Sequence, residues 1–315
     1  MVDVAQLFAI VVSGIGLGAL YALVAMGFSL IYKVTGVLNF AQGEFALVGA
    51  YAVVIIGSGA FLGLPAPVAV AGAVAVGVVL GVVLERVVFR QFIGEPVLSV
   101  IIVTLALAGI FRGLVQFALG PNFRGYPAAL RPEWSVPLPL GVDLSAAFAI
   151  GVALSLLLVV ALMAFFRYTV VGSILRAASS DQQAAMVLGV SIERTIVIAW
   201  TLSIALTAIG GMLLAMSRGG AAFNIRTVGI IIFAAVVFGG LDSIPGAFLG
   251  ALVVGVLQEV GTFYFEGGSA VVVPGLGVPA NFGPGFGEIL PLIFLLVVIV
   301  VKPYGLFGTE RIERL

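Results

Sequence analysis

Three polar side chains stand together in a part of the chain that is otherwise apolar. Asn39, Gln42 and Glu44 fall within the stretch Val37–Tyr51, which reads VLNFAQGEFALVGAY, and Gly43 lies among them. The two amides can donate and accept hydrogen bonds, and the carboxylate can carry a charge. Such groups are costly in apolar surroundings unless they meet a partner or water. We therefore expect them to line or support a path for a polar solute.

The elements that position these residues are membrane-spanning helices. Hydrophobic residues make up 62% of the chain and charged residues 9%, and the mean hydropathy is +1.31. A soluble domain carries about 25% charged residues, and one span needs about 20 mostly apolar residues. The continuous apolar runs are Leu7–Tyr32, Phe45–Ile56, Ala66–Phe89, Val97–Leu119, Leu144–Phe166, Thr195–Met216, Val228–Phe238, Ile244–Phe263 and Ile289–Val301. They predict an all-α polytopic membrane protein with about nine transmembrane helices in a single domain, residues 1–315. A barrel is excluded because the runs do not alternate.

Two interpretations of the polar stretch remain open. Thr35, Gly36 and the segment from Asn39 to Gly43 could break a long apolar helix at membrane depth. Such a break is tolerated only where it is buried in protein or lines a cavity, and it would offer free backbone groups to a solute. The alternative is an inner turn between two spans, because Lys33 is typical of an interface.

Several kinds of chemistry have no support in the sequence. Cysteine and histidine are absent, which removes disulfides and the commonest metal ligand. No GxxxxGK[ST], HExxH or GxSxG motif is present. We therefore expect no cofactor, no metal and no enzyme, and a net charge of zero gives no support for binding nucleic acid. Transport driven by something outside this chain fits better.

Basic residues predict the orientation of the chain, because cytoplasmic loops are enriched in Lys and Arg. With the loop after Phe166 inside, alternating spans place nine basic residues inside and four outside, and Arg112 lies within a span. The inner group is Lys33, Arg86, Arg90, Arg167, Arg176, Arg194, Lys302, Arg311 and Arg314; the outer group is Arg124, Arg131, Arg218 and Arg226. The N-terminus is then expected outside and the C-terminus in the cytoplasm.

The segment Arg167–Arg194 is too polar to span and is predicted to be cytoplasmic. Within it, Ile174–Leu188 lacks proline and glycine and alternates apolar and polar residues, which predicts one short amphipathic helix that ends at Gly189. Such a helix could lie on lipid. Its small residues, such as Ala184, suit a groove in another protein better.

Three connecting segments have distinct compositions. Gly120–Asp143 is rich in proline and aromatic residues, and it is either a loop that caps the bundle outside or a docking surface for an extracytoplasmic partner. Phe265–Gly287 is predicted to be an outer loop with a possible re-entrant piece. Gly239–Gly246 is expected to be a tight cytoplasmic turn, in which Asp242 or Ser243 caps the next helix.

The stretch GFSLIYKVTGVLNFAQGEFALVGAY resembles a signature of bacterial branched-chain amino acid ABC transporter permeases, the LivH-like subunits. Gln42 stands where histidine is usual in that family. The segment GSILRAASSDQQAAMVLGVSIER is similar to the family's cytoplasmic coupling segment. Two later segments, FAAVVFGGLDSIPGAFLGALVVGVLQE and VKPYGLFG, are similar to later parts of the family pattern. The resemblance implies ATPase coupling through Arg176, Ala177, Asp181, Ala184, Ala185 and Gly189.

The resemblance implies the membrane half of an ATP-driven importer in the bacterial inner membrane. Its expected partners are a second permease subunit, either a sister or a copy, two ATP-binding subunits, and an extracytoplasmic substrate-binding protein. Branched-chain or related amino acids are the expected substrates, and permeases of related sequence carry urea, short amides or simple sugars. Two other classes stay open: an ion-coupled secondary transporter with Glu44 as the carrier, and a structural membrane scaffold.

Overall fold

The structure is a computed structural model that describes residues 4–266, 285–302 and 305–308. Within these ranges, six helices are long and apolar enough to cross a membrane, and three shorter helices are also apolar. The long helices are α1 (Val4–Thr35), α3 (Ala66–Val87), α4 (Val97–Leu119), α5 (Ala146–Tyr168), α8 (Ile192–Ser217) and α10 (Ile244–Gly261), the last continued by a π-helical turn, η5 (Thr262–Glu266). The shorter ones are α2 (Gln42–Gly57), α9 (Val228–Gly239) and α11 (Phe286–Val301). Each coincides with one predicted run, which confirms the all-α polytopic class.

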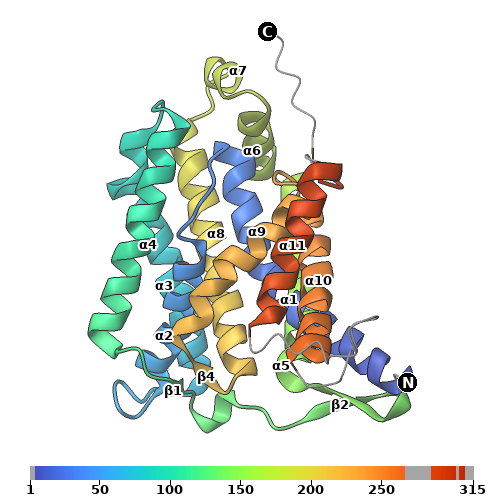
Figure 1. Cartoon of the computed structure of the whole chain (residues 1–315). Helices are drawn as coiled ribbons and strands as arrows, with labels where there is room; N and C mark the ends of the chain where they lie inside the picture. Colours follow the sequence, from blue (N-terminus) through green and yellow to red (C-terminus); the bar gives the residue numbers. More distant parts are fainter. Residues whose placement is uncertain (1–3, 267–284, 303–304, 309–315) are drawn as a thin grey trace.

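The two ends of the bundle carry different structures (Figure 1). At one end, the helical end, α7 (Gln182–Val187) projects beyond the other helices, and α6 (Val170–Ser180) leads to it. At the opposite strand end, β1 (Arg124–Gly125) pairs with β4 (Gly220–Ala221), and β2 (Ser135–Leu138) pairs with β3 (Val142–Ser145). Short 3-10 turns complete the chain: η1 (Phe89–Phe92), η2 (Ala128–Leu130), η3 (Pro139–Gly141) and η4 (Phe223–Thr227). Helix α1 begins at the strand end and α11 finishes at the helical end.

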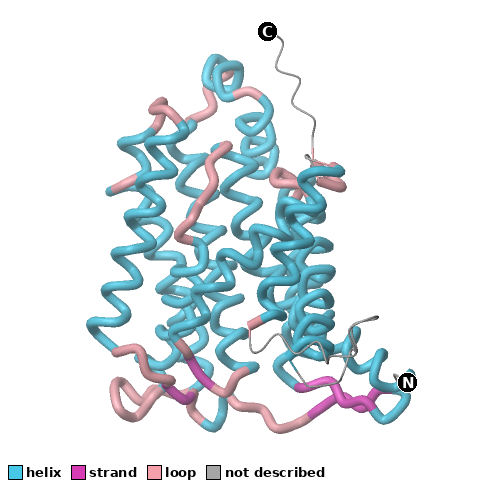
Figure 2. The backbone as a smooth tube through the Cα atoms, viewed as in Figure 1, coloured by secondary structure: helices cyan, strands magenta, loops and turns pink. Residues whose placement is uncertain are grey.

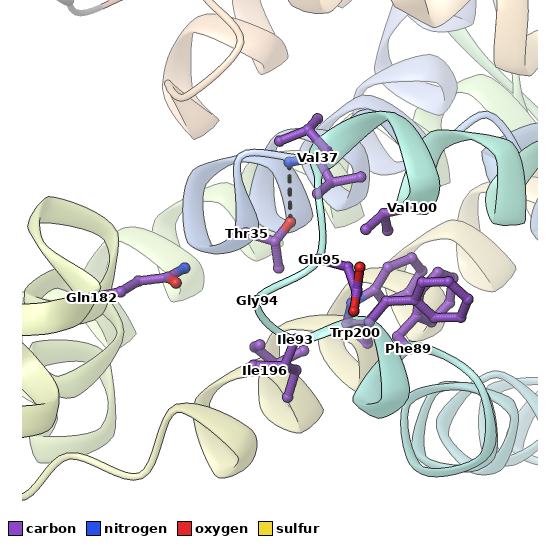
Figure 3. Close-up of a pocket in the computed structure, with 12 residues that line it drawn as sticks. Thr35, Val37, Phe89, Ile93, Gly94, Glu95, Val100, Gln182, Ile196 and Trp200 are labelled. Atoms are coloured by element: carbon purple, nitrogen blue, oxygen red, sulfur yellow. Dashed lines mark hydrogen bonds between the residues drawn. The ribbon is translucent and has the colours of Figure 1, made fainter.

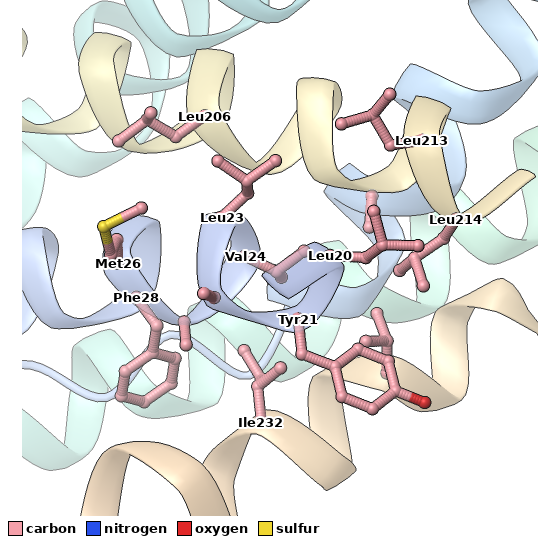
Figure 4. Packing of buried hydrophobic residues seen from close by; sticks show 14 of the residues in the cluster. Leu20, Tyr21, Leu23, Val24, Met26, Phe28, Leu206, Leu213, Leu214 and Ile232 are labelled. Atoms are coloured by element: carbon pink, nitrogen blue, oxygen red, sulfur yellow. The ribbon is translucent and has the colours of Figure 1, made fainter. Parts of the chain in front are cut away.

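Helix α1 lies at the centre of the core. In the most apolar part of each helix, the share of buried residues is 61% for α1 and 72% for α8. The same share is only 22% for α4 and for α5. Figure 4 shows Leu23 and Tyr21 of α1 among side chains that include Leu213 of α8 and Ile232 of α9. The shares of buried residues therefore place α1 and α8 in the interior and α4 and α5 at the periphery.

Residues 36–41 are not helical and separate α1 from α2, and we call them the α1–α2 break. Figure 2 shows the break as an extended pink segment that descends from the helical end into the bundle. Val37, Asn39 and Ala41 are buried. The sequence left open a buried break or an inner turn, and the structure shows a buried break.

The starts of α2 and α9 cross inside the bundle. A Cβ on Gly43 would collide with the carbonyl oxygen of Arg226, and a Cβ on Gly229 would lie 2.9 Å from the Cα of Gly43. Only glycine permits this approach. The backbone of Arg226 therefore takes part in this crossing.

The two short helices leave the crossing in opposite directions. Helix α2 leads to the strand end, where Gly57 approaches Pro127. Helix α9 leads to the helical end, where Ser29 Oγ donates to the Leu241 carbonyl at 2.9 Å. At about 1.5 Å per residue, α2 and α9 are about 24 and 18 Å long, too short to cross a hydrocarbon core of about 30 Å alone. Each therefore forms part of a broken span, and the two short helices run in opposite directions (Figure 1).

The predicted single helix Ile174–Leu188 is wrong, because the chain forms two helices that meet at Asp181. The backbone of Asp181 is extended, and its side chain accepts a hydrogen bond from the Ala184 N–H at 3.0 Å. An aspartate that caps the next turn in this way competes with continuation of the helix. Two other predictions are confirmed: Gly189 ends α7 with φ +87°, and Ser243 caps α10 by accepting from the Gly246 N–H.

The outer loops agree with the sequence only in part. Gly120–Asp143 forms β1, the β2 strand and short 3-10 turns across the strand end. Most of the predicted loop Phe265–Gly287, including the possible re-entrant piece, lies outside the described residues.

The crossing of α2 and α9 gives a test of the fold. Replacing Gly43 with Ala should lower the free energy of unfolding by about 1–3 kcal/mol, because overpacking a tight contact forces the backbone apart. Unfolding in mixed detergent micelles measures this. A Cβ on Gly109 of α4 would meet no neighbouring atom within 4 Å among the described residues, so Gly109→Ala is the matched control. Equal stability of the two variants would show that the helix starts do not meet.

Candidate functional site

Side chains satisfy the backbone of the α1–α2 break. The Ala41 N–H donates to Asn39 Oδ1 at 3.1 Å, and the Phe40 N–H donates to Thr104 Oγ1 of α4 at 3.2 Å. A backbone N–H that lacks a partner at membrane depth costs several kcal/mol. Asn39 therefore holds the conformation of the break, and Thr104 ties the break to α4.

Gln42 is the centre of a buried amide and hydroxyl network. Asn39 Nδ2 donates to Gln42 Oε1 at 2.7 Å, and Gln42 Nε2 donates to Thr207 Oγ1 of α8. Ser203 Oγ and the Val24 carbonyl oxygen each lie 3.4 Å from the same nitrogen. These partners lie well inside α8 and α1, so the network is deep in the bundle. Both amides are bonded to the protein, and they position the start of α2.

Glu44 carries the charge in this region and is paired. Arg112 Nη2 of α4 lies 2.9 Å from Glu44 Oε1. Arg112 is about 22 Å from the start of α4 and about 10 Å from its end, so the pair lies within the span. Glu44 is also in the first turn of α2, where the positive end of the helix dipole stabilises an anion.

The two partners of the pair differ in exposure. The Glu44 side chain is 6% exposed and the Arg112 side chain is 44% exposed. A half-exposed guanidinium inside a membrane span is costly against lipid. This part of α4 therefore suits contact with water, a solute or another protein better than contact with lipid tails.

The structure brings the three predicted path residues together but gives them different surroundings. Asn39 and Gln42 turn inward and bond to the protein, whereas Glu44 turns toward α4. The sequence analysis placed Arg112 in a span without assigning it a role, and it missed Ser203 and Thr207. A single arginine and a single glutamate in separate spans could have suggested the pair.

The coupling segment presents most of its predicted residues to the surface. Arg176, Ala177, Asp181, Ala184 and Gly189 are exposed. Ala185 is only 2% exposed and packs in the chain's own core. Ala185 therefore anchors α7 to this chain, which corrects its expected place on the partner-facing side.

Apolar residues that the sequence analysis did not assign form the tip of this segment. Met186, Val187 and Leu188 are 53%, 88% and 82% exposed. Met186 and Val187 belong to α7 and Leu188 is its C-cap, and α7 projects from the helical end (Figure 1).

A cavity of about 250 Å³ lies beneath α7 at the same end (Figure 3). Thr35, Glu95, Gln182 and Trp200 are among its lining residues, and the Trp200 ring stacks on Phe89 with centroids 3.7 Å apart. Gln182 reaches across: its Nε2 donates to the Val34 carbonyl at 3.2 Å. This bond joins α7 to the last turn of α1, directly before the break.

Among the residues that the structure describes, no group of three His, Cys, Asp or Glu side chains could hold a metal ion.

The Glu44–Arg112 pair can be tested by a double-mutant cycle. Arg112→Gln leaves a buried carboxylate unpaired and should cost about 1–3 kcal/mol of stability, below the about 3–5 kcal/mol of a fully buried pair because the guanidinium is half exposed. Adding Glu44→Gln removes that carboxylate charge, so the double variant should recover most of the loss. Unfolding midpoints in micelles measure all four proteins. Additive losses would mean that the two groups do not interact.

Comparisons with known proteins agree with this architecture. The family model described as "Branched-chain amino acid transport system / permease component" matches residues 10–301. The "High-affinity branched-chain amino acid transport system permease protein LivH" of Escherichia coli (strain K12) is 25% identical over 311 residues, 96% of each chain. The protein BraD of Pseudomonas aeruginosa, with the same description, is 26% identical over 315 residues and 96% of each chain. A probable LivH of Methanocaldococcus jannaschii is 28% identical over 309 residues, 94% of this chain and 91% of its own.

The match covers α1 from residue 10 onward, the other five long apolar helices, the α1–α2 break and both short helices at the crossing. The chain is thus a multi-pass membrane protein, and it belongs to the branched-chain amino acid transport system permease family.

Proposed function

We propose that this chain is the membrane-spanning subunit of an ATP-driven importer that moves branched-chain or related amino acids across the bacterial inner membrane. Family membership and the names of the relatives support the substrate class. The proposal that ATP supplies the energy rests on the exposed apolar tip of the coupling segment, residues 167–194.

The tip needs a protein partner. Val187 and Leu188 are more than four-fifths exposed, on a segment that projects beyond the ends of the other helices (Figure 1). A cluster of exposed apolar side chains on a water-facing projection is typical of a protein contact. We assign it to a groove on an ATP-binding subunit, with Arg176, Ala177, Asp181, Ala184 and Gly189 as further contacts.

A continuous set of contacts leads from the tip to the site. Gln182 of α7 bonds to Val34 of α1, and the break that follows leads directly to Gln42 and Glu44. When an ATP-binding subunit moves α7, the same movement acts on the end of α1. The break would then move between two positions, and this movement would shift the balance between the inward-open and outward-open states.

Glu44 supports an externally driven importer over an ion-coupled transporter. A carboxylate that carries a proton or ion must bind and release it during the cycle, whereas Glu44 is nearly buried and paired with Arg112. In this proposal Glu44 and Arg112 form part of the path, and Asn39 and Gln42 support it.

The remaining partners follow from the two ends. The helical end faces the cytoplasm, and the strand end, with the loop Gly120–Asp143, receives the extracytoplasmic binding protein. A second permease subunit, a sister or a copy, covers an outer face of the bundle.

Changing the tip tests the energy coupling. Leu188→Asp should abolish copurification of ATPase activity with this chain from native membranes, because a charge cannot enter an apolar groove without a partner. Val136→Asp, on the exposed β2 strand at the opposite end, is the control and should retain ATPase activity. Undiminished ATPase activity with Leu188→Asp would remove α7 from the contact. Ala185 is unsuitable for this test, because a larger residue there would overpack the chain itself.

The orientation can be tested directly because the chain contains no cysteine. A cysteine at position 131, in place of the exposed Arg131, should react with a membrane-impermeant maleimide in intact cells. A cysteine in place of Gln182 should react only after the membrane is opened. The opposite pattern would place the α6–α7 end outside.

A further inference from the structure

An apolar groove of about 270 Å³ opens between α2, α3 and α4. Its walls include Val48, Ile55, Val76, Phe111, Leu114 and Ala118. Tyr51 is the one lining residue with a polar side chain, and its hydroxyl is 3.5 Å from the Asn122 carbonyl. Pockets for drug-sized ligands measure about 300–1,000 Å³, so the groove suits a smaller apolar group.

Glu44 and Arg112 each lie about one helical turn from a residue that lines this groove. Val48 follows Glu44 by four residues on α2, and Val115, another lining residue, follows Arg112 by three on α4. Residues at these spacings share one face of a helix, about one turn apart. Both helices run toward the strand end, so these groove residues lie on the strand-end side of the ion pair.

We propose that the groove and the Glu44–Arg112 pair together form a transit site for an apolar α-amino acid. This inference rests on the function proposed above and names where that substrate is held. The carboxylate of the amino acid bonds to free N–H groups of Arg112, its ammonium group bonds to Glu44, and its side chain occupies the groove.

The chemistry of the site selects a zwitterion with an apolar side chain. Arg112 has five N–H donors and uses one on Glu44, so a fork remains for a second carboxylate. The zwitterion and the ion pair are each neutral overall. When the zwitterion binds to the pair, two positive and two negative groups alternate, so the membrane holds no net charge. Urea has no charges for the pair, and a sugar would leave its hydroxyls unpaired against the apolar walls.

The site is built for weak binding. The substrate must compete with the bond that Glu44 and Arg112 already make at 2.9 Å. A transport path requires sites from which the solute can leave. The internal pair therefore keeps the charges satisfied when the site is empty and limits the affinity when it is full.

Cysteine protection tests the site without depending on transport. Ala118 is exposed on the groove wall, and Ala118→Cys places a single thiol there in a cysteine-free chain. In the assembled complex in lipid nanodiscs, millimolar L-leucine should slow reaction with a small water-soluble methanethiosulfonate at least fivefold. Glycine, which has the same charged groups and no side chain, should not. Adding Arg112→Gln and Glu44→Gln should remove the protection by leucine.

The control is Val136→Cys, on the exposed β2 strand, whose labelling leucine should leave unchanged. Protection by glycine as strong as that by leucine, or protection that survives the double substitution, would overturn the site. A thiol that stays unreactive in lipid but reacts in detergent, with no effect of leucine, would show that an acyl chain fills the groove. Leucine uptake by the unsubstituted complex tests the proposed function separately: uptake without protection refutes the groove alone, and absence of ATP-driven uptake refutes the function.

Discussion

The structure depends on satisfying non-helical backbone deep inside a membrane bundle. Six residues, 36–41, leave the helix between α1 and α2, and hydrocarbon offers no water to their N–H and carbonyl groups. Thr35, Asn39 and Thr104 supply side-chain oxygens to this backbone. The polar cluster around Asn39 is therefore, in large part, what makes a broken span possible.

The break in turn allows a helix to begin inside the bundle. Helices α2 and α9 both start at the crossing of Gly43 and Gly229, so two helix N-termini, each with a partial positive charge, lie near one another. Glu44 stands in the first turn of α2 and meets Arg112. The geometry of the backbone thus creates a place where a carboxylate is stable and where an arginine can be kept within a span.

The two ends of the molecule are connected through this region. At the helical end, α7 bonds to the last turn of α1 through Gln182 and Val34. At the other side, α2 carries Glu44 and the apolar face of the groove toward the strand end. A non-helical joint therefore lies between α7 and the Glu44–Arg112 pair, and it connects the helical end to the interior of the bundle.

The sequence by itself determined the membrane class, the nine apolar helices, and the unusual status of Asn39, Gln42 and Glu44, because hydrophobic length and local polarity are properties of neighbouring residues. It also located the end of α7 at Gly189 from a single residue type. Tertiary structure alone decided that Arg112 pairs with Glu44, 68 residues away, and that Thr207 receives the amide of Gln42 from 165 residues away. It also decided that Ala185 packs into the chain's own core. Such pairings follow from how helices cross, and spacing along the chain carries no information about them.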